Sequence, residues 1–405
     1  MNFALAGLPA SGVERVRSDS LSKEYKRRIV SDRTPVSASI ELTYRCNLHC
    51  GHCYCPPGDR SSELSTGELR GVIDRLAELG TLFLLLTGGD PLLRKDFPEL
   101  YRHAKERGLL ITVFTNGTLI DDRIAALWEE LPPYLVEISL YGLTRAVYEK
   151  VVAVPGSYDR CLAGISRVLE GGHPLALKCP VTRDNAHEIP GIAQLAKDLG
   201  VDFRYDPVLL ATMEGKQHPH ELRLSAEEIV AFEAADLEKD RAWRKYLVDE
   251  TQPAIASDAL FSCGAGKNSL HVDPYGNVQV CLMVKNFKHS LREQSLDEIY
   301  FDEFPKILAL KRDVSSKCGS CRSRATCNNC PGMALWETGR NDSNVDFLCG
   351  LTAVRERTYT GALTDALAPA PGGGCGSGGG GCGSGACGNA GSGGGGGLLQ
   401  IGGGR

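Results

Sequence analysis

The chain has 405 residues, of which 42% are hydrophobic and 16 are cysteine, and it carries a formal net charge of -5. A chain of this length and hydrophobic content buries a sizeable core and is expected to form two domains. The weakly acidic balance excludes a global basic field for nucleic acid, and we expect no signal peptide and no membrane span. The cytoplasm, where thiols stay reduced and available to metals, is therefore the expected compartment.

The first part of the chain predicts an alternating pattern of strands and helices. Residues 1–36 are expected to be an N-terminal extension, and the alternation begins at about residue 37. The predicted strands cover residues 39–42, 82–86, 110–114, 135–140, 175–181 and 203–208. The predicted helices cover residues 66–79, 96–107, 121–130, 157–170 and 188–199. Six strands with five helical crossovers predict an α/β fold with a partial (β/α)6 barrel over residues 37–245, whose functional loops follow the strand ends.

The first of these loops contains three cysteines in the spacing CxxxCxxC. Cys46, Cys50 and Cys53 follow the first predicted strand directly. Three thiolates from one loop can surround a cubic iron-sulfur cluster and leave one iron open to an outside ligand. Structural zinc sites and ferredoxin clusters usually use four protein ligands, so the set of three favours the open cluster. A zinc knuckle that uses His49 or His52 is the alternative.

In this motif and its position, the sequence resembles the radical S-adenosylmethionine (SAM) superfamily. The resemblance implies that the open iron binds SAM, and that reductive cleavage of SAM yields methionine and a 5′-deoxyadenosyl radical. It also implies that His52 lies against the adenine, where many members have another aromatic residue. After the second strand, Gly88 and Gly89 would allow close backbone approach and Asp90 would hold the SAM ammonium. The usual family residue at this last position is glutamate, which is one methylene longer.

Later strand ends supply further candidate residues for the SAM pocket. Asn116, which follows the third predicted strand, is expected to line the pocket; the alternative is that it only tolerates a left-handed turn. The resemblance implies that Ser139, in the fourth strand, binds the ribose hydroxyls. Lys178 and Arg183, on and after the fifth strand, are candidates to bind the SAM carboxylate or the substrate.

Seven more cysteines follow the barrel. The segment 273–281 predicts a β-hairpin that turns at Tyr275-Gly276-Asn277 and brings Cys263 and Cys281 together. The other five form a CxxCxxxxxCxxC array with one further cysteine, namely Cys318, Cys321, Cys327, Cys330 and Cys349. A zinc ribbon is the alternative, but it would use four of the seven cysteines and leave three without a role.

The seven cysteines in this order resemble the SPASM domain of radical SAM enzymes that modify peptides and proteins, here residues 246–360. The ligand sets that this resemblance implies are Cys263, Cys281 and Cys330 (the first auxiliary set) and Cys318, Cys321, Cys327 and Cys349 (the second auxiliary set). The family pattern has one more residue between Cys327 and Cys330. Three 4Fe-4S clusters are thus expected, and the first auxiliary set lacks a fourth cysteine. Cys55 is expected to reach the active cavity.

Residues 361–405 are predicted to be a flexible, low-complexity tail. Of the 34 residues from Gly372 to Arg405, 20 are glycine, and three are cysteines, Cys375, Cys382 and Cys387. Three roles are open: an inert extension, a donor of the missing cluster ligand, or a fused substrate segment like a ribosomal peptide precursor. A glycine-rich coil of this length can reach back to the barrel.

These features predict a radical SAM enzyme that modifies a peptide or protein, with thioether crosslinking of a cysteine-containing ribosomal peptide as the leading reaction. Carbon-carbon crosslinking, decarboxylation and sulfatase-maturase-type side-chain oxidation stay open, because the cluster set is common to all of them. A non-enzymatic iron-sulfur electron carrier is the alternative, and it leaves Ser139 unexplained. Expected partners are the substrate, an electron donor such as flavodoxin or ferredoxin, and a separate leader-peptide-binding protein.

Overall fold

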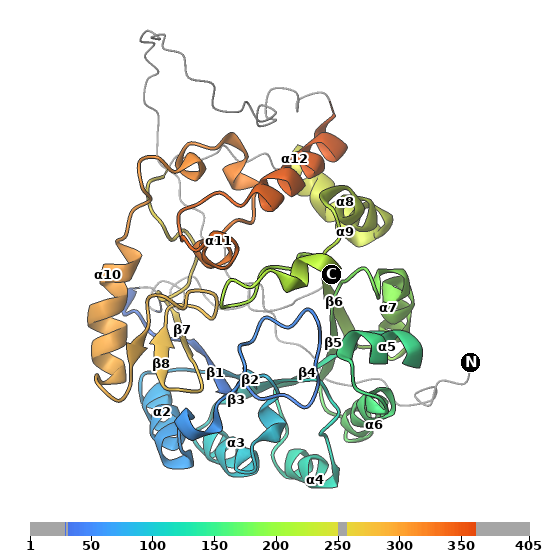
Figure 1. The fold of residues 1–405 in the computed structure, drawn as a ribbon. Helices are drawn as coiled ribbons and strands as arrows, with labels where there is room; N and C mark the ends of the chain where they lie inside the picture. Colours follow the sequence, from blue (N-terminus) through green and yellow to red (C-terminus); the bar gives the residue numbers. More distant parts are fainter. Residues whose placement is uncertain (1–28, 30, 250–256, 362–405) are drawn as a thin grey trace.

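The computed structural model describes residues 29, 31–249 and 257–361 (Figure 1). Most of the predicted N-terminal extension and the predicted tail from residue 362 onward lie outside the described residues. The described chain contains one nine-stranded sheet, in the order β6-β5-β4-β3-β2-β1-β7-β8-β9. No helix of this part of the chain is long and apolar enough to cross a membrane.

Six parallel strands and the helices between them form the partial barrel, as predicted. The strands are β1 (Ser37–Thr43), β2 (Phe83–Gly88), β3 (Leu110–Thr115), β4 (Leu135–Ser139), β5 (Leu175–Pro180) and β6 (Asp202–Asp206). The helices are α2 (Thr66–Glu78), α3 (Phe97–Glu106), α4 (Asp122–Glu130), α5 (Arg145–Val152), α6 (Ser157–Glu170) and α7 (Ile189–Asp198). All six strands and five of these helices match the predicted runs, whereas α5 was not predicted.

Alternation along the strands explains why these segments form a barrel. In β1, Ile40 and Leu42 are fully buried in the apolar core, while Glu41 between them points to the opposite face of the sheet. The helices that cover the sheet begin at defined caps. At the start of α2, the Ser65 hydroxyl accepts a hydrogen bond from the Glu68 amide, and the Glu68 carboxylate accepts one from the Ser65 amide.

The predicted hairpin is confirmed, and it belongs to the barrel sheet. β7 (Ser269–Val272) and β8 (Asn277–Gln279) are antiparallel, and Gly276 in the turn has φ = +83°. β7 runs parallel to β1 and pairs with it from Ser37↔Ser269 to Ile40↔Val272, while β9 (His289–Ser290) extends the sheet beyond β8. The predicted domain boundary at residue 245 therefore separates strands that share one sheet.

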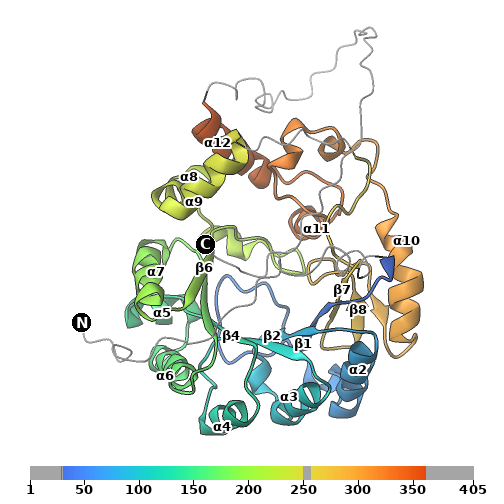
Figure 2. The same cartoon turned by 180° about the vertical axis from the view of Figure 1, so that it is seen from behind.

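The remaining helices lie beyond the barrel or beside the hairpin (Figures 1 and 2). They are α8 (Ala226–Ala235), α9 (Leu237–Arg244), α10 (Phe304–Leu308), α11 (Pro331–Thr338) and α12 (Asp346–Thr360). A buried ion pair joins α12 to α8: Arg355 Nε lies 2.9 Å from Glu233 Oε2, and Arg355 Nη2 lies 2.7 Å from Glu233 Oε1. Helix α12 therefore packs on α8, which follows the barrel.

Candidate functional site

The CxxxCxxC loop lines a cavity of about 430 Å³ directly after β1. Cys46, Cys50 and Cys53 all contribute to its wall, and their thiols lie close enough to affect one another. Burial raises the pKa of Cys46 to about 11, and the nearby Asp90 and Cys53 add to this rise. Cys55, on the same wall, donates a hydrogen bond that holds the pKa of Cys53 below its usual range. The structure therefore gathers the three predicted ligands, and Cys55 lines their cavity as expected.

Gly88 and Gly89 hold this loop by close backbone contact. The Gly89 amide donates to the Thr43 carbonyl at 2.7 Å, and the Asp90 amide donates to the Arg45 carbonyl at 3.0 Å. A Cβ atom on Gly88 would lie 2.1 Å from the Thr43 oxygen, and one on Gly89 would lie 2.3 Å from the Arg45 oxygen. Both positions therefore require glycine for contact with the chain itself. Their approach to SAM stays a prediction.

Asp90 is a fully buried carboxylate that connects the turns after β2 and β3. Its Oδ2 accepts hydrogen bonds from the Thr115 hydroxyl at 2.8 Å and the Asn116 amide at 2.9 Å, and its Oδ1 accepts one from the Leu92 amide at 3.0 Å. Burial raises the pKa of Asp90 to about 6. These three donors give Asp90 a structural role, and its predicted contact with the SAM ammonium stays a prediction.

Asn116 contacts the cysteine loop through its side chain. Its Nδ2 donates to Asn47 Oδ1 at 2.9 Å and to Cys46 Sγ at 3.6 Å, while its Oδ1 accepts from the Thr118 amide at 2.9 Å. The left-handed conformation belongs to the next residue, Gly117, which has φ = +78°. The alternative that Asn116 only tolerates a left-handed turn is therefore wrong, because this side chain supports the loop.

His52 and Ser139 meet at Tyr141. The His52 ring is buried and lies 5.3 Å from the Tyr141 ring, and burial lowers the pKa of His52 to about 4, so the imidazole is neutral near pH 7. Tyr141 lies close to Ser139 and to Cys50. Ser139 is therefore brought next to the cysteine loop that contains His52.

Two cations share the carboxylate of Glu137, Lys178 from within the barrel and Arg204 with a side chain that is 54% exposed. Lys178 Nζ lies 3.2 Å from Glu137 Oε1 and 3.6 Å from the centre of the Phe114 ring, and Arg204 Nε donates to Glu137 Oε2 at 3.0 Å. Burial lowers the pKa of Lys178 to about 8. Asp90 also acts on Lys178 and Asp206 on Arg204, so the two cations interact with several carboxyl groups.

Arg183 is not brought to this interior group. Its guanidinium is about half exposed and pairs with Glu228 at 3.1 Å, at the start of α8. The Arg183 amide donates to the Leu222 carbonyl at 2.9 Å. In this structure the side chain therefore points to an exposed ion pair, and only Lys178 of the two predicted cations lies inside the barrel.

A second interior charge network was missed by the sequence reasoning. Glu41 Oε2 lies 3.0 Å from His271 Nε2 and 3.1 Å from Lys285 Nζ, and Lys285 Nζ also donates to the Tyr44 hydroxyl at 2.9 Å. Burial opposes ionisation, but His271 and Lys285 outweigh it and hold the pKa of Glu41 below its usual range. Glu41 Oε1 is buried and has no hydrogen-bond partner within the described ranges. A glutamate inside an apolar strand was the signal that could have identified this site.

The seven later cysteines form two groups. The first contains Cys263, Cys281 and Cys330, and the second contains Cys318, Cys321, Cys327 and Cys349. Burial, with the neighbouring thiols of Cys330 and Cys263, raises the pKa of Cys281 to about 11. Burial, with the other three thiols of the second group, raises the pKa of Cys349 to about 11. These groups coincide with the two auxiliary sets, whose role as cluster ligands stays a prediction.

Backbone amides donate hydrogen bonds to two sulfurs of the first auxiliary set. The Met283 amide donates to Cys281 Sγ at 3.5 Å, and the Met333 amide donates to Cys330 Sγ at 3.4 Å. Such bonds favour the ionised thiolate, which is the form that binds a metal. Within residues 31–249 and 257–361, no three histidine, cysteine, aspartate or glutamate side chains converge as the ligands of a single metal ion would. Because this also holds for the three cysteine groups, it does not distinguish cluster ligands from zinc ligands.

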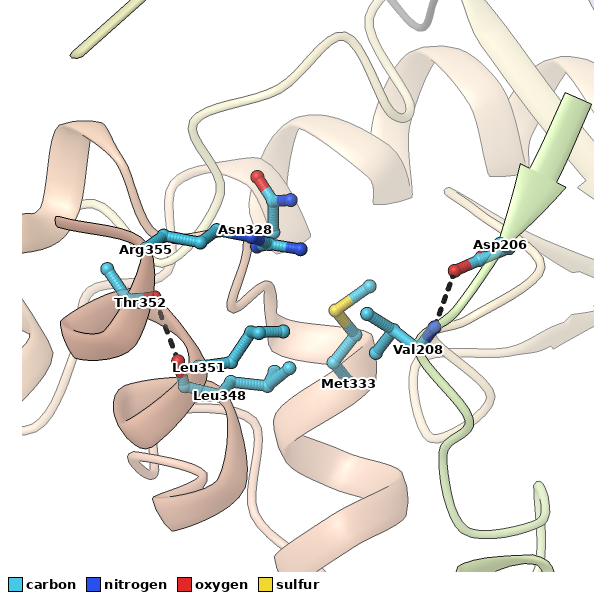
Figure 3. Close-up of a pocket in the computed structure, with 8 residues that line it drawn as sticks. All are labelled: Asp206, Val208, Asn328, Met333, Leu348, Leu351, Thr352 and Arg355. Atoms are coloured by element: carbon cyan, nitrogen blue, oxygen red, sulfur yellow. Dashed lines mark hydrogen bonds between the residues drawn. The ribbon is translucent and has the colours of Figure 1, made fainter. Parts of the chain in front are cut away.

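A smaller cavity lies between the end of β6 and helices α11 and α12 (Figure 3). Its volume is about 120 Å³, and it is lined by Asp206, Val208, Asn328, Met333, Leu348, Leu351, Thr352 and Arg355. Ligand sites usually enclose roughly 300 Å³ or more, so this cavity is too small for SAM or a peptide. Of these two cavities, only the one at the cysteine loop has a suitable volume.

Comparison with known families decides the class of the protein. The family described as Radical SAM superfamily matches residues 40–196, from β1 into α7. The chain contains a radical SAM domain, and the protein is an enzyme. The domain implies a 4Fe-4S cluster and SAM as cofactors, and it decides against a non-enzymatic electron carrier.

Individual relatives of the radical SAM domain cover different shares of the chain. Fe-coproporphyrin III synthase of Methanosarcina barkeri is 34% identical over 47% of this chain and 48% of its own length, so that match spans about half of each protein. AdoMet-dependent heme synthase of the same organism is 26% identical over 77% of this chain and 95% of its own length. PqqA peptide cyclase of Gluconobacter oxydans is 26% identical over 80% and 92%, respectively.

A solved structure supports the fold beyond the matched family segment. Streptococcus suis SuiB bound to its precursor peptide SuiA has a TM-score of 0.60 and 17% identity, and the match covers 83% of each chain. At this identity the likeness concerns the fold alone. The matched share is larger than the radical SAM segment, so the similarity of fold extends into the cysteine-rich region.

Proposed function

We propose that the protein modifies a peptide by SAM radical chemistry and holds three 4Fe-4S clusters. The observation that carries the proposal is the distribution of ten cysteines into one group on the barrel loop and two groups in the C-terminal part. A peptide substrate is supported by the likeness to PqqA peptide cyclase and to SuiB with a bound precursor peptide. We also propose that the protein is cytoplasmic.

The barrel residues would hold the SAM cluster and SAM. In this proposal Cys46, Cys50 and Cys53, which line the 430 Å³ cavity, would hold the cluster. When bound, the cluster and SAM supply a 5′-deoxyadenosyl radical that removes a hydrogen atom from an unactivated carbon. His52 and Tyr141 provide an aromatic wall beside the loop. Buried and neutral, the His52 ring is suited to lie against an adenine.

Thioether crosslinking is the leading reaction, because the first auxiliary set has only three cysteines. A cluster held by Cys263, Cys281 and Cys330 would have one iron without a cysteine ligand, to which a substrate thiolate could bind. The substrate thiol must lose a proton to bind there. Lys285 lies close to Cys281 and pairs with Glu41 at 3.1 Å, so its positive charge would favour the thiolate form at this set.

A porphyrin carboxylate is the second candidate substrate. It is favoured by the relatives named Fe-coproporphyrin III synthase and AdoMet-dependent heme synthase. It is also favoured by the two cations Lys178 and Arg204 beside Glu137, because carboxylates bind well to such cations. In this alternative the radical would remove a hydrogen atom from a propionate side chain, loss of CO2 would give a vinyl group, and an auxiliary cluster would accept the remaining electron.

One experiment separates these candidates. Reduced, anaerobically reconstituted protein is incubated with SAM and either coproporphyrin or a synthetic peptide of residues 372–405. Both proposals expect 5′-deoxyadenosine, and the variant with Cys46, Cys50 and Cys53 all replaced by alanine is the control that forms none. Crosslinking makes the peptide lighter by two hydrogens per thioether and its cysteine resistant to alkylation. An unchanged peptide together with a decarboxylated porphyrin contradicts the peptide proposal.

The tail can be tested separately, although it lies outside the described residues. If the tail is a substrate, deletion after Pro369 abolishes the crosslinked product and leaves SAM cleavage. If it donates a ligand, the deletion changes the spectrum of the first auxiliary cluster with no covalent change to the tail. An unchanged tail mass and an unchanged spectrum leave the inert extension.

A further inference from the structure

Arg312 lies on a short backbone bridge between the two auxiliary sets. The Arg312 amide donates to the Asp258 carbonyl at 2.7 Å, and the Leu260 amide donates to the Leu310 carbonyl at 2.9 Å. Leu260 is three residues before Cys263, whereas Arg312 is six residues before Cys318. The paired backbone therefore fixes Arg312 where the segments that lead to the two sets run side by side.

Thiols of both sets act electrostatically on this guanidinium. Burial lowers the pKa of Arg312, and the nearby Arg324 lowers it further, whereas Cys318, Asp342 and Cys330 raise it. Cys318 belongs to the second auxiliary set and Cys330 to the first. The positive charge of Arg312 therefore interacts with a thiol of each set.

The protein alone does not satisfy this guanidinium. Arg312 Nη2 donates to the Leu260 carbonyl at 3.3 Å, but Arg312 Nε is buried and has no hydrogen-bond partner among the residues that the structure describes. The nearby carboxylate of Asp342 already pairs with Arg340 and accepts a hydrogen bond from the Asp313 amide. A buried cationic N–H without a protein partner is suited to an anionic acceptor.

We propose that Arg312 is a positioning residue for the auxiliary clusters, whose Nε donates to a sulfur of one cluster while its charge raises the reduction potential of both. The inference rests on the proposed function, because it requires occupied auxiliary sets. A 4Fe-4S cluster with thiolate ligands is anionic, so it supplies the acceptor that Nε lacks. Reduction adds a further negative charge, which a nearby cation stabilises. Arg312 would thus favour transfer of the substrate electron to these clusters.

The test measures the potentials of the auxiliary clusters alone. The full chain in which Cys46, Cys50 and Cys53 are alanine is reconstituted and titrated anaerobically by EPR. Arg312→Met is expected to lower the ratio of reduced to oxidised cluster at least about tenfold at a fixed potential, which is about 59 mV for one electron. Lys311→Met is the matched control: it removes a neighbouring positive charge that is exposed and paired with Asp258, and the ratio should change less than twofold.

Arg312→Lys separates charge from geometry. It keeps the positive charge and loses the planar fork, so a smaller shift in the same direction is expected. Wild-type potentials in a fully loaded Arg312→Met chain overturn the inference. If Arg312→Met loses iron, the Arg312→Lys chain is measured instead. A partial fall of the reduction potentials in Arg312→Lys supports the inference. Wild-type potentials or a similar loss of iron in Arg312→Lys overturn it. Fewer than eight irons in the parent chain refute the three-cluster proposal itself, and the inference with it.

Discussion

The buried ion pair between α8 and α12 offers a test of how these two helices are held together. Arg355 and Glu233 form two parallel hydrogen bonds, and their side chains are 5% and 6% exposed. The guanidinium also lies 4.4 Å from the Trp243 ring. Arg355→Ala leaves the Glu233 carboxylate buried and unpaired. Removal of one partner of such a pair typically costs about 3–5 kcal/mol of unfolding free energy.

An exposed pair of similar geometry provides the control. Arg102 and Glu130 also form two parallel hydrogen bonds, but their side chains are 41% and 58% exposed. Arg102→Ala should change the unfolding free energy little, because water and salt screen exposed charges. Anaerobic urea denaturation, followed by circular dichroism, compares both variants with the wild type. An equal effect of the two substitutions refutes the reasoning.

A double variant identifies the cause of the lower unfolding free energy of Arg355→Ala. Glu233→Met combined with Arg355→Met removes both charges and replaces them with apolar side chains of similar length. Because a buried pair can often be exchanged for well-packed apolar residues without loss, most of the stability should return. If the double variant is as unstable as Arg355→Ala, the cost comes from lost packing, including the contact with Trp243, and not from the unpaired carboxylate.

Three further substitutions test the cluster and SAM assignments. Replacement of Cys46, Cys50 and Cys53 by alanine should lower the iron content from about twelve to about eight per chain and abolish 5′-deoxyadenosine, and continued SAM cleavage would contradict the assignment. Cys349→Ala should lose iron from the second auxiliary set and keep SAM cleavage; normal product with full iron would argue against this ligand. Asp90→Ala should weaken SAM binding in equilibrium dialysis. The substitution removes the proposed partner of the SAM ammonium and the carboxylate that joins the turns after β2 and β3. An unchanged affinity for SAM would speak against both roles in SAM binding.

Local sequence patterns predicted most of the barrel, because each strand and helix carries its own periodicity. The predicted helix 157–170 has the bounds of α6, and the other predicted elements differ from the structure by a few residues at their ends. The pairing of β7 with β1 could not be predicted in this way. Its partners are more than 230 residues apart, and only the folded sheet brings Ser37 next to Ser269.

In the candidate site, too, residues close in sequence could be predicted together and residues from distant segments could not. The CxxxCxxC loop was found because metal-binding loops have short, characteristic spacings, whereas the two auxiliary sets were inferred from the resemblance to the SPASM domain. Glu41, His271 and Lys285 come from distant segments, and no local spacing connects them. Asn116 was singled out, but its support of the cysteine loop became visible only when the loop and the end of β3 were placed together.

The β1–β7 pairing also joins the barrel loop to the first part of the cysteine-rich region. Cys46 follows β1 by three residues, and Cys281 follows β8 by two, so both thiols are attached to one hydrogen-bonded sheet. A hinge between β1 and the β7–β8 hairpin would have to break that sheet, and it would expose an open edge of β1. The separation of the strand ends that carry these two thiols is therefore set by strand geometry. In the proposed function, a SAM cluster and a first auxiliary cluster would thus be held on one rigid support.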